Sequence, residues 1–215
     1  MKIAVVAANG RVGRLVVKEA VDRGNDVTAF VREDANDTVA QHVVKKDLFD
    51  LTTDDLKDFD VVIDAFGAWA PEALPLHVKS LMHLVDILKG ADVRLLVVGG
   101  AGSLYVDSER KMRLVDTPDF PDEFKPLASA QVAQFDELEK NGDEVEWTYI
   151  SPAADFQADG ERTGECILAG DELTTNDRDE SVISYADYAL AMVDEAERTG
   201  TPDAHIREHL SVVRK

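Results

Sequence analysis

Thiols and positive charges are scarce in this chain. Its 215 residues include one cysteine, Cys166, so no internal disulfide can form. We expect Cys166 to be a small buried residue in a reducing compartment. Lysine and arginine number 23 against 43 acidic residues, which gives a formal net charge of −20. Because so negative a surface repels phosphate backbones and anionic lipid, we expect neither nucleic acid nor a membrane as a partner.

Long apolar runs are also missing. No run approaches the roughly 20 residues that a membrane-spanning helix needs. No basic region followed by an apolar stretch and a cleavage site opens the sequence, so we expect a cytoplasmic protein. No repeat or linker divides the chain, and its length most simply makes one domain, residues 1–215, whose core needs neither metal nor disulfide.

Patterns typical of metal and hydrolase sites are absent as well. His77 and His83 stand at a spacing that does not suit a metal ion. His205 and His209 are four residues apart, but no third ligand pattern accompanies them, so we expect no metal. No Gly-x-Ser-x-Gly sequence is present to form a nucleophile elbow.

An apolar strand followed by a glycine turn opens the chain. Residues 3–8 read Ile-Ala-Val-Val-Ala-Ala, and the turn Asn9–Gly13 leads directly into a helical pattern. Gly10 would let the backbone approach a pyrophosphate, and Gly13 would let the helix lie close to the strand. The glycine that usually begins this fingerprint is Ala7 here. The turn predicts a dinucleotide cradle, and a turn that binds nothing is the alternative.

The second and third apolar strands end in polar residues that suit an adenosine pocket. The strand at residues 26–31 is followed by Arg32, about twenty positions beyond the glycine turn. In dinucleotide sites the residue at this position contacts the adenosine ribose: an acid binds a free 2′-hydroxyl, and an arginine binds a 2′-phosphate. Arg32 therefore favours NADP(H) over NAD(H), unless it is only a solvated charge at a strand end. After residues 42–46, Asp47 could bond the adenine amino group while Leu48 covers the ring. A simple turn acid is an equal alternative for Asp47.

Further strands and helices alternate along the chain. The expected strands cover residues 60–65, 93–98, 145–150, 165–168, 181–183 and 210–213. The expected helices cover residues 74–89 and 127–140, and a last one runs from a cap at Ser184 through Glu197. This order predicts a Rossmann-type α/β fold: a doubly wound parallel sheet in three α/β/α layers, with a small C-terminal extension on the substrate side.

Residues 99–125 show no periodic pattern. An irregular stretch of that length commonly serves as a lid or a substrate wall. Within it, Ser103 is a candidate catalytic residue that would orient cofactor or substrate, and Tyr105 could stack on a planar ring. For each of them a plain loop role is an equal alternative.

Several motifs in order resemble one family. They are Ala-Ala-Asn-Gly-Arg-Val-Gly at 7–13, Val-Arg at 31–32, Leu-Leu-Val-Val-Gly-Gly-Ala-Gly-Ser at 95–103, Trp-Thr-Tyr-Ile-Ser-Pro-Ala at 147–153, Gly-Glu-Arg-Thr-Gly at 160–164 and Ile-Ser-Tyr-Ala-Asp-Tyr at 183–188. Together they look like the atypical short-chain dehydrogenase/reductases. Within that group the chain is similar to the NAD(P)H-binding proteins called NADH-flavin reductases, which are relatives of biliverdin IXβ reductase and of NmrA-like proteins.

The resemblance implies a set of cofactor-binding residues. They are Ala8, Asn9, Gly10, Arg11, Val12, Gly13, Arg32, Asp47, Leu48, Ala65, Phe66, Gly67, Gly99, Gly100, Pro152 and Ala153. In this set the turn would hold the pyrophosphate, and residues 65–67 would border the ribose on the adenosine side. Gly99, Gly100 and Ser103 would border the nicotinamide, and residues 152–153 would lie against its ring.

The tyrosines argue against carbonyl reduction. Typical short-chain dehydrogenases protonate a carbonyl with the tyrosine of Tyr-x-x-x-Lys. No lysine stands four residues after Tyr105, Tyr149, Tyr185 or Tyr188. A flavin, quinone or linear tetrapyrrole delocalises the charge that hydride addition leaves, so positioning alone can suffice.

We therefore predict an NAD(P)H-dependent oxidoreductase that passes hydride to a planar conjugated acceptor such as FMN or riboflavin. The alternative from another class is an NmrA-like protein that senses NADP(H) without turnover. An isomerase or epimerase is a third option, which the missing Tyr-Lys pair disfavours. We expect a monomer or a homodimer.

Overall fold

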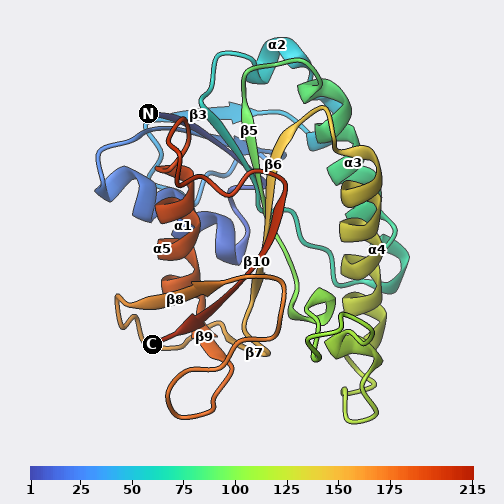
Figure 1. The fold of residues 1–215 in the computed structure, drawn as a ribbon. Helices are drawn as coiled ribbons and strands as arrows, with labels where there is room; N and C mark the ends of the chain where they lie inside the picture. The colour runs from blue at the N-terminus through green and yellow to red at the C-terminus, as the bar shows by residue number, and fades with distance from the viewer.

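An eight-stranded sheet forms the centre of the computed structural model, which describes all of residues 1–215 (Figure 1). Its strands are β1 (Lys2–Val6), β2 (Asp26–Val31), β3 (His42–Lys45), β4 (Val61–Asp64), β5 (Arg94–Val98), β6 (Glu146–Pro152), β8 (Cys166–Ala169) and β10 (Glu208–Arg214). They lie in the order β3-β2-β1-β4-β5-β6-β10-β8, and every neighbouring pair is parallel except β10 and β8. The predicted Rossmann-type sheet is confirmed.

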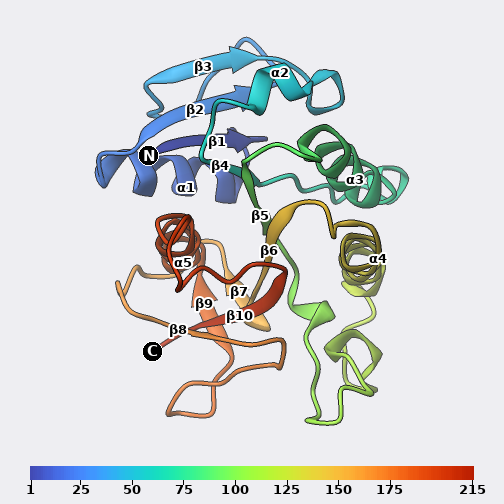
Figure 2. The same cartoon turned by 45° about the horizontal axis from the view of Figure 1, so that its top comes forward.

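Helices cover both faces of this sheet, which makes the three predicted layers (Figure 2). On one face α1 (Arg11–Asp22) packs against α5 (Tyr185–Ala196), and on the other α3 (Leu76–Leu88) packs against α4 (Lys125–Asn141). A single turn, α2 (Thr53–Leu56), begins with a capping box formed by Thr52 and Asp55. No helix in the structure combines the length and the apolar character needed to cross a bilayer.

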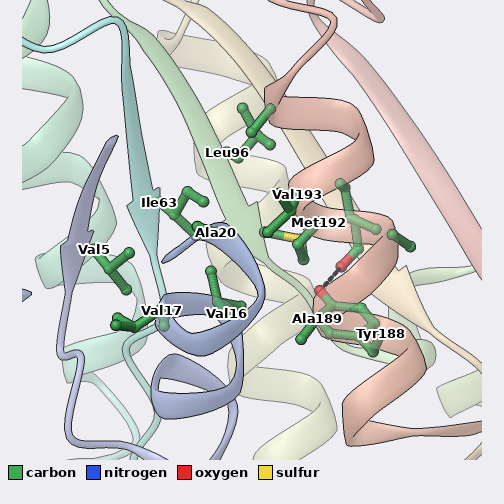
Figure 3. Packing of buried hydrophobic residues seen from close by; sticks show 14 of the residues in the cluster. Val5, Val16, Val17, Ala20, Ile63, Leu96, Tyr188, Ala189, Met192 and Val193 are labelled. Atoms are coloured by element: carbon green, nitrogen blue, oxygen red, sulfur yellow. Dashed lines mark hydrogen bonds between the residues drawn. The ribbon is translucent and has the colours of Figure 1, made fainter. Parts of the chain in front are cut away.

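Alternate residues of the strands enter two separate cores. Val5 and Ile63 face α1 and α5, where they join Val16, Tyr188 and Met192 (Figure 3). Neighbouring strand residues point the other way, so Ala4 and Val62 belong to the cluster that includes α3 and α4. Because both faces are covered, the strands read as continuous apolar runs, as buried parallel strands do.

A second, two-stranded sheet lies beyond β6. It pairs β7 (Asp155–Gln157) with β9 (Val182–Ser184) in parallel. The sequence predicts β9 but not β7, because three residues after a proline give too short a pattern to register as a strand.

The irregular segment after β5 is more ordered than its sequence pattern suggests. It contains short 3-10 turns at Ala101–Ser103 and Leu114–Asp116, and Tyr105 forms isolated bridges with Arg113 and Glu172. Both turns pack against α4, beside its first residues in Figure 1. This segment therefore forms a fixed wall next to the carboxyl end of β5.

Candidate functional site

A cleft of about 950 Å³ opens at the carboxyl ends of β1, β4, β5 and β6. In doubly wound sheets this edge, where the strand order reverses, is the usual place for a ligand. The sequence-predicted residues that line it are Gly10, Arg11, Val12, Ala65, Phe66, Gly67, Gly99, Gly100, Pro152 and Ala153. Four segments far apart in the sequence thus meet around one space.

The glycine turn fits a pyrophosphate. The Gly10 amide donates to the carbonyl oxygen of Ala7 at 2.9 Å, and Gly10 is the N-cap of the 12-residue helix α1. No side chain caps this helix and no acid lies in its first turn, so its N-terminal amides keep their capacity for an anion. A Cβ on Gly13 would stand 2.8 Å from the Ala7 oxygen and 2.9 Å from the Ala8 oxygen, so only glycine allows the helix to approach this closely.

Ala7 occupies a left-handed conformation, with a φ of 56°. An alanine pays a steric cost in this region that a glycine does not, which explains why glycine usually opens the fingerprint. The departure from the family pattern is therefore local strain in the backbone. The turn itself keeps its shape.

Asn9 and Arg32 lie outside the lining of the cleft. The Asn9 side chain donates through Nδ2 to the Ala35 carbonyl oxygen at 2.7 Å and accepts at Oδ1 from the Asp37 backbone amide at 3.0 Å. These two bonds hold the loop after β2 against the glycine turn. The Arg32 side chain is 78% exposed, and its Nε lies 3.5 Å from a Glu33 carboxylate oxygen. Arg32 is therefore an accessible cation at the start of the loop that Asn9 anchors, and its contact with a 2′-phosphate stays a prediction.

Leu48 and Asp47 have structural contacts of their own. Leu48 is 9% exposed and belongs to the hydrophobic cluster that includes Phe30, and its contact with an adenine ring stays a prediction. Asp47 accepts from the Phe49 amide at 2.9 Å and caps the 3-10 turn Leu48–Asp50. This is the turn-acid arrangement that the sequence left open.

Ser103 corrects the expectation of a hydroxyl that touches a ligand. Its side chain is fully buried and does not line the cleft. Its Oγ donates to the Gly100 carbonyl at 2.8 Å and lies 3.0 Å from the Ser151 Oγ and 3.2 Å from the His209 Nε2. The 3-10 turn Ala101–Ser103 turns the side chain inward, toward partners that only the folded chain brings close.

Tyr105 does not line the cleft either. Its backbone bridges Arg113 and Glu172, and the Arg113 guanidinium lies 5.4 Å from the centre of its ring. The Arg113 guanidinium therefore makes a cation–π contact with this ring.

Ser103, Ser151 and His209 form one buried network around the Gly100 carbonyl. The Ser151 Oγ lies 3.0 Å from that carbonyl and 2.9 Å from the His209 Nε2. The hydroxyls of Ser103 and Ser151 can both donate to the Gly100 carbonyl while the His209 Nε2–H donates to both serine oxygens. In this arrangement each of the three polar hydrogens has an acceptor. The His209 Nδ1 is buried without a partner, and burial lowers the pKa of His209 to about 4. The geometry thus assigns a neutral, Nε2-protonated histidine that holds the Gly100 backbone in place.

Asp64, the last residue of β4, supports the turn at residues 65–67 on another side of the cleft. It is 1% exposed, and one carboxylate oxygen accepts from the Phe66 amide at 3.0 Å while the other has no partner. Burial raises the pKa of this carboxyl to about 6. The bond to Phe66 fixes the turn at residues 65–67, which lines the cleft.

Aromatic side chains that the sequence analysis missed complete the lining. Trp69 and Phe124 are 66% and 50% exposed, which is unusual for residues of their size. Phe156 and Tyr185 lie 4.1 Å apart between ring centres, and the Arg11 guanidinium is 5.6 Å from the Tyr185 ring. Further lining residues from the wall segment and α4 are Leu114, Phe120, Leu127 and Gln131.

The remaining candidates are structural. Cys166 is half-buried, its Sγ donates to the Asp187 carbonyl at 3.3 Å, and burial raises the pKa of the thiol to about 12, so it is a poor nucleophile. No group of three or more His, Cys, Asp or Glu side chains is arranged to hold a metal ion. The cleft thus offers an anion-binding turn at one end and flat apolar walls at the other.

Comparisons with known proteins agree with this geometry. Residues 7–198 match a family described as NAD(P)H-binding. The uncharacterized protein YwnB of Bacillus subtilis (strain 168) is 46% identical over 99% of this chain and 98% of its own length. The crystal structure of SP1627 from Streptococcus pneumoniae TIGR4, described as a "putative NADH-flavin reductase", is 53% identical with a TM-score of 0.95 over 100% of both chains. A "putative epimerase" from Bacteroides thetaiotaomicron is 33% identical with a TM-score of 0.83 over 99% of this chain and 96% of its own.

Proposed function

This chain belongs to the NAD(P)H-binding family, within the atypical short-chain dehydrogenase/reductases that its sequence resembles, and from that premise we propose that it is an oxidoreductase. It uses NAD(P)H to reduce a flat conjugated acceptor, most simply a flavin such as FMN or riboflavin. The observation that carries the proposal is a single cleft that joins a glycine turn to a wall of exposed aromatic side chains. The similarity to SP1627, with its description, supports the same activity.

The turn end of the cleft suits the cofactor. The backbone amides of residues 11–13, at the N-terminus of α1, would bind the diphosphate, with Arg11 as the nearby cation. The flat surface made by Gly99, Gly100 and Pro152 would border the nicotinamide. When bound there, NAD(P)H supplies a hydride at the nicotinamide ring. The chain would position the nicotinamide, because the buried network of Ser103, Ser151 and His209 holds the Gly100 backbone in place.

We also propose that the cofactor is NADP(H) in preference to NAD(H). Arg32 follows β2, the strand whose end meets the adenosine ribose in this fold. Its guanidinium is exposed and lies on the loop that Asn9 ties to the glycine turn, so it can reach a 2′-phosphate without displacing a buried partner.

The aromatic end suits an acceptor that needs no strong acid. Tyr185 is the tyrosine in the lining, and Ala189 stands where a Tyr-x-x-x-Lys pair would have its lysine. A flavin takes up the hydride and then a proton from water, which completes its two-electron reduction while the nicotinamide is oxidised. The aromatic side chains would hold the ring flat and limit access of water to it.

Anaerobic mixing with NADPH and a flavin tests the proposal. We expect a flavin-dependent loss of the 340 nm absorbance of NADPH. The Phe124→Ala variant should raise the KM for the flavin by about threefold to tenfold, because a stacking surface is lost. Phe49→Ala is the matched control, since Phe49 is 42% exposed but lies outside the cleft lining. Equal effects of the two substitutions would contradict the assignment of the acceptor end.

Binding without turnover is the second candidate. It is favoured by one observation: Ser103 and Tyr105, the expected catalytic side chains, do not line the cleft. A protein that senses NADP(H) would bind the cofactor tightly and leave the 340 nm absorbance unchanged with every flavin. An epimerase needs an acid–base pair that the missing Tyr-x-x-x-Lys dyad does not provide.

A further inference from the structure

Acidic side chains border the acceptor end of the cleft. The charged residues in the lining are Arg11, Asp119 and Asp155. Arg11 follows Gly10 in the glycine turn and lies over Tyr185. Asp119 is exposed in the wall segment, next to Phe120, and Asp155 is exposed in β7. Two carboxylates and one guanidinium, that of Arg11 over Tyr185, therefore leave the acceptor end with a net negative charge.

No cation of the wall segment offsets that charge. Every lysine and arginine between residues 101 and 125 is engaged by a carboxylate other than Asp119. The pairs are Arg110 with Asp171, Lys111 with Glu109, Arg113 with Asp136, and Lys125 with Asp122. Asp155 accepts a hydrogen bond at 2.6 Å from the neutral amide of Gln157. The chain as a whole adds a net charge of −20 to this local field.

We propose that the acceptor end selects neutral flat molecules over phosphorylated ones, so that riboflavin is preferred to FMN. This inference rests on the proposed function and specifies its substrate class. A phosphate monoester carries a charge of about −1.5 to −2 at neutral pH, and the exposed carboxylate of Asp119 repels it. The hydroxyl groups of an uncharged ribityl tail can instead donate hydrogen bonds to that carboxylate. Trp69 and Phe124 stack equally well on the ring of either flavin.

Flavin fluorescence measures this selection without turnover. The protein is saturated with NADP⁺, which cannot donate hydride, and titrated with riboflavin or FMN. We expect riboflavin to bind about tenfold more tightly in low-salt buffer, which corresponds to about 1.4 kcal/mol. Because dissolved ions screen exposed charges, the ratio should fall to about twofold in about 0.5 M NaCl. A ratio that salt leaves unchanged would mean that shape discriminates the two flavins, and would overturn the inference.

Charge reversal at Asp119 tests whether this carboxylate causes the preference for riboflavin. Asp119→Lys should remove or reverse the preference for riboflavin, and Asp119→Asn should reduce it. The matched control is Asp143→Lys, which makes the same change in net charge at an exposed position just beyond the other end of α4. The 17 residues of that helix put about 25 Å between its ends. The control should keep the wild-type ratio.

The outcomes separate the inference from the proposed function. Equal dissociation constants for the two flavins in low salt, or an Asp119→Lys ratio equal to that of the control, overturn the charge selection. Preferential binding of riboflavin without any oxidation of NADPH refutes the reductase and upholds the selection.

Discussion

Replacing Asp64 by asparagine should make the protein more stable at neutral pH. The carboxyl is buried, and burial raises its pKa from an ordinary value of 3.8 to about 6. A raised pKa means that the folded chain holds the proton more tightly than the unfolded chain. The stability that this proton confers is complete below pH 3.8 and is lost as the pH rises through about 6.

The magnitude follows from the two pKa values. The interval between 3.8 and about 6 corresponds to about 3 kcal/mol of unfolding free energy, most of it lost between pH 4 and pH 6. An asparagine cannot ionise, and its side-chain oxygen can still accept from the Phe66 amide, which lies 3.0 Å from Asp64 Oδ1. At pH 7.5 the variant should therefore gain up to about 3 kcal/mol over the wild type, or about 6–12 °C in Tm.

Thermal unfolding between pH 4 and pH 8 is the assay. The difference in Tm between Asp64→Asn and the wild type should grow with pH up to about 6.5 and then stay constant. Asp143→Asn removes an exposed carboxylate and controls for net charge. If the Asp64→Asn and wild-type curves run parallel over this range, Asp64 does not titrate in a buried environment and the reasoning fails.

Three further predictions concern the cleft. Arg32→Asp should weaken NADPH binding in calorimetry by about tenfold to a hundredfold, with little effect on NADH, because a charge-assisted phosphate contact contributes about 1.5–3 kcal/mol; an unchanged ratio would exclude Arg32 from the 2′-phosphate site. Gly13→Ala should lower the unfolding free energy by about 1–3 kcal/mol, since its Cβ would stand 2.8 Å from the Ala7 oxygen; unaltered stability would contradict the close packing of α1. Nitrogen NMR at pH 6 should show His209 as a neutral, Nε2-protonated ring, because burial lowers its pKa to about 4, and an imidazolium signal would rule out the assigned network.

Local pattern was enough to predict the fold. The strand predicted at residues 26–31 is β2 without change, and the apolar run, glycine turn and helical pattern at the start of the chain become β1 and α1. These predictions succeed because buried parallel strands and amphipathic helices each produce a hydrophobic pattern over a few consecutive residues. The position of the glycine turn in the cleft follows from the sheet topology, which the alternation of elements determines.

Side-chain direction within the loops could not be predicted in this way. Ser103 lies in the 3-10 turn after β5, and its sequence neighbours do not reveal that His209, 106 residues later, is its buried hydrogen-bond partner. The burial of Leu48, in a cluster that includes Phe30 of β2, is likewise not apparent from its sequence neighbours. In both cases a long-range partner decides which way the side chain turns.

The aromatic lining of the cleft is the part of the site that was hardest to predict from the sequence. Trp69 lies in the loop after β4, Phe124 caps α4, and Tyr185 begins α5. Trp69 and Phe124 belong to none of the family motifs, and the motif at 183–188 that contains Tyr185 does not reveal that this ring lines a cleft. Only the packing of three separate elements brings the three side chains around one cleft.

A crystal structure of the chain grown with NADP⁺ tests the central claim most directly. We expect the diphosphate on the backbone amides of residues 11–13, and the nicotinamide beside Gly99, Gly100 and Pro152. A nucleotide bound elsewhere on the chain, or none bound at millimolar concentration, would contradict it.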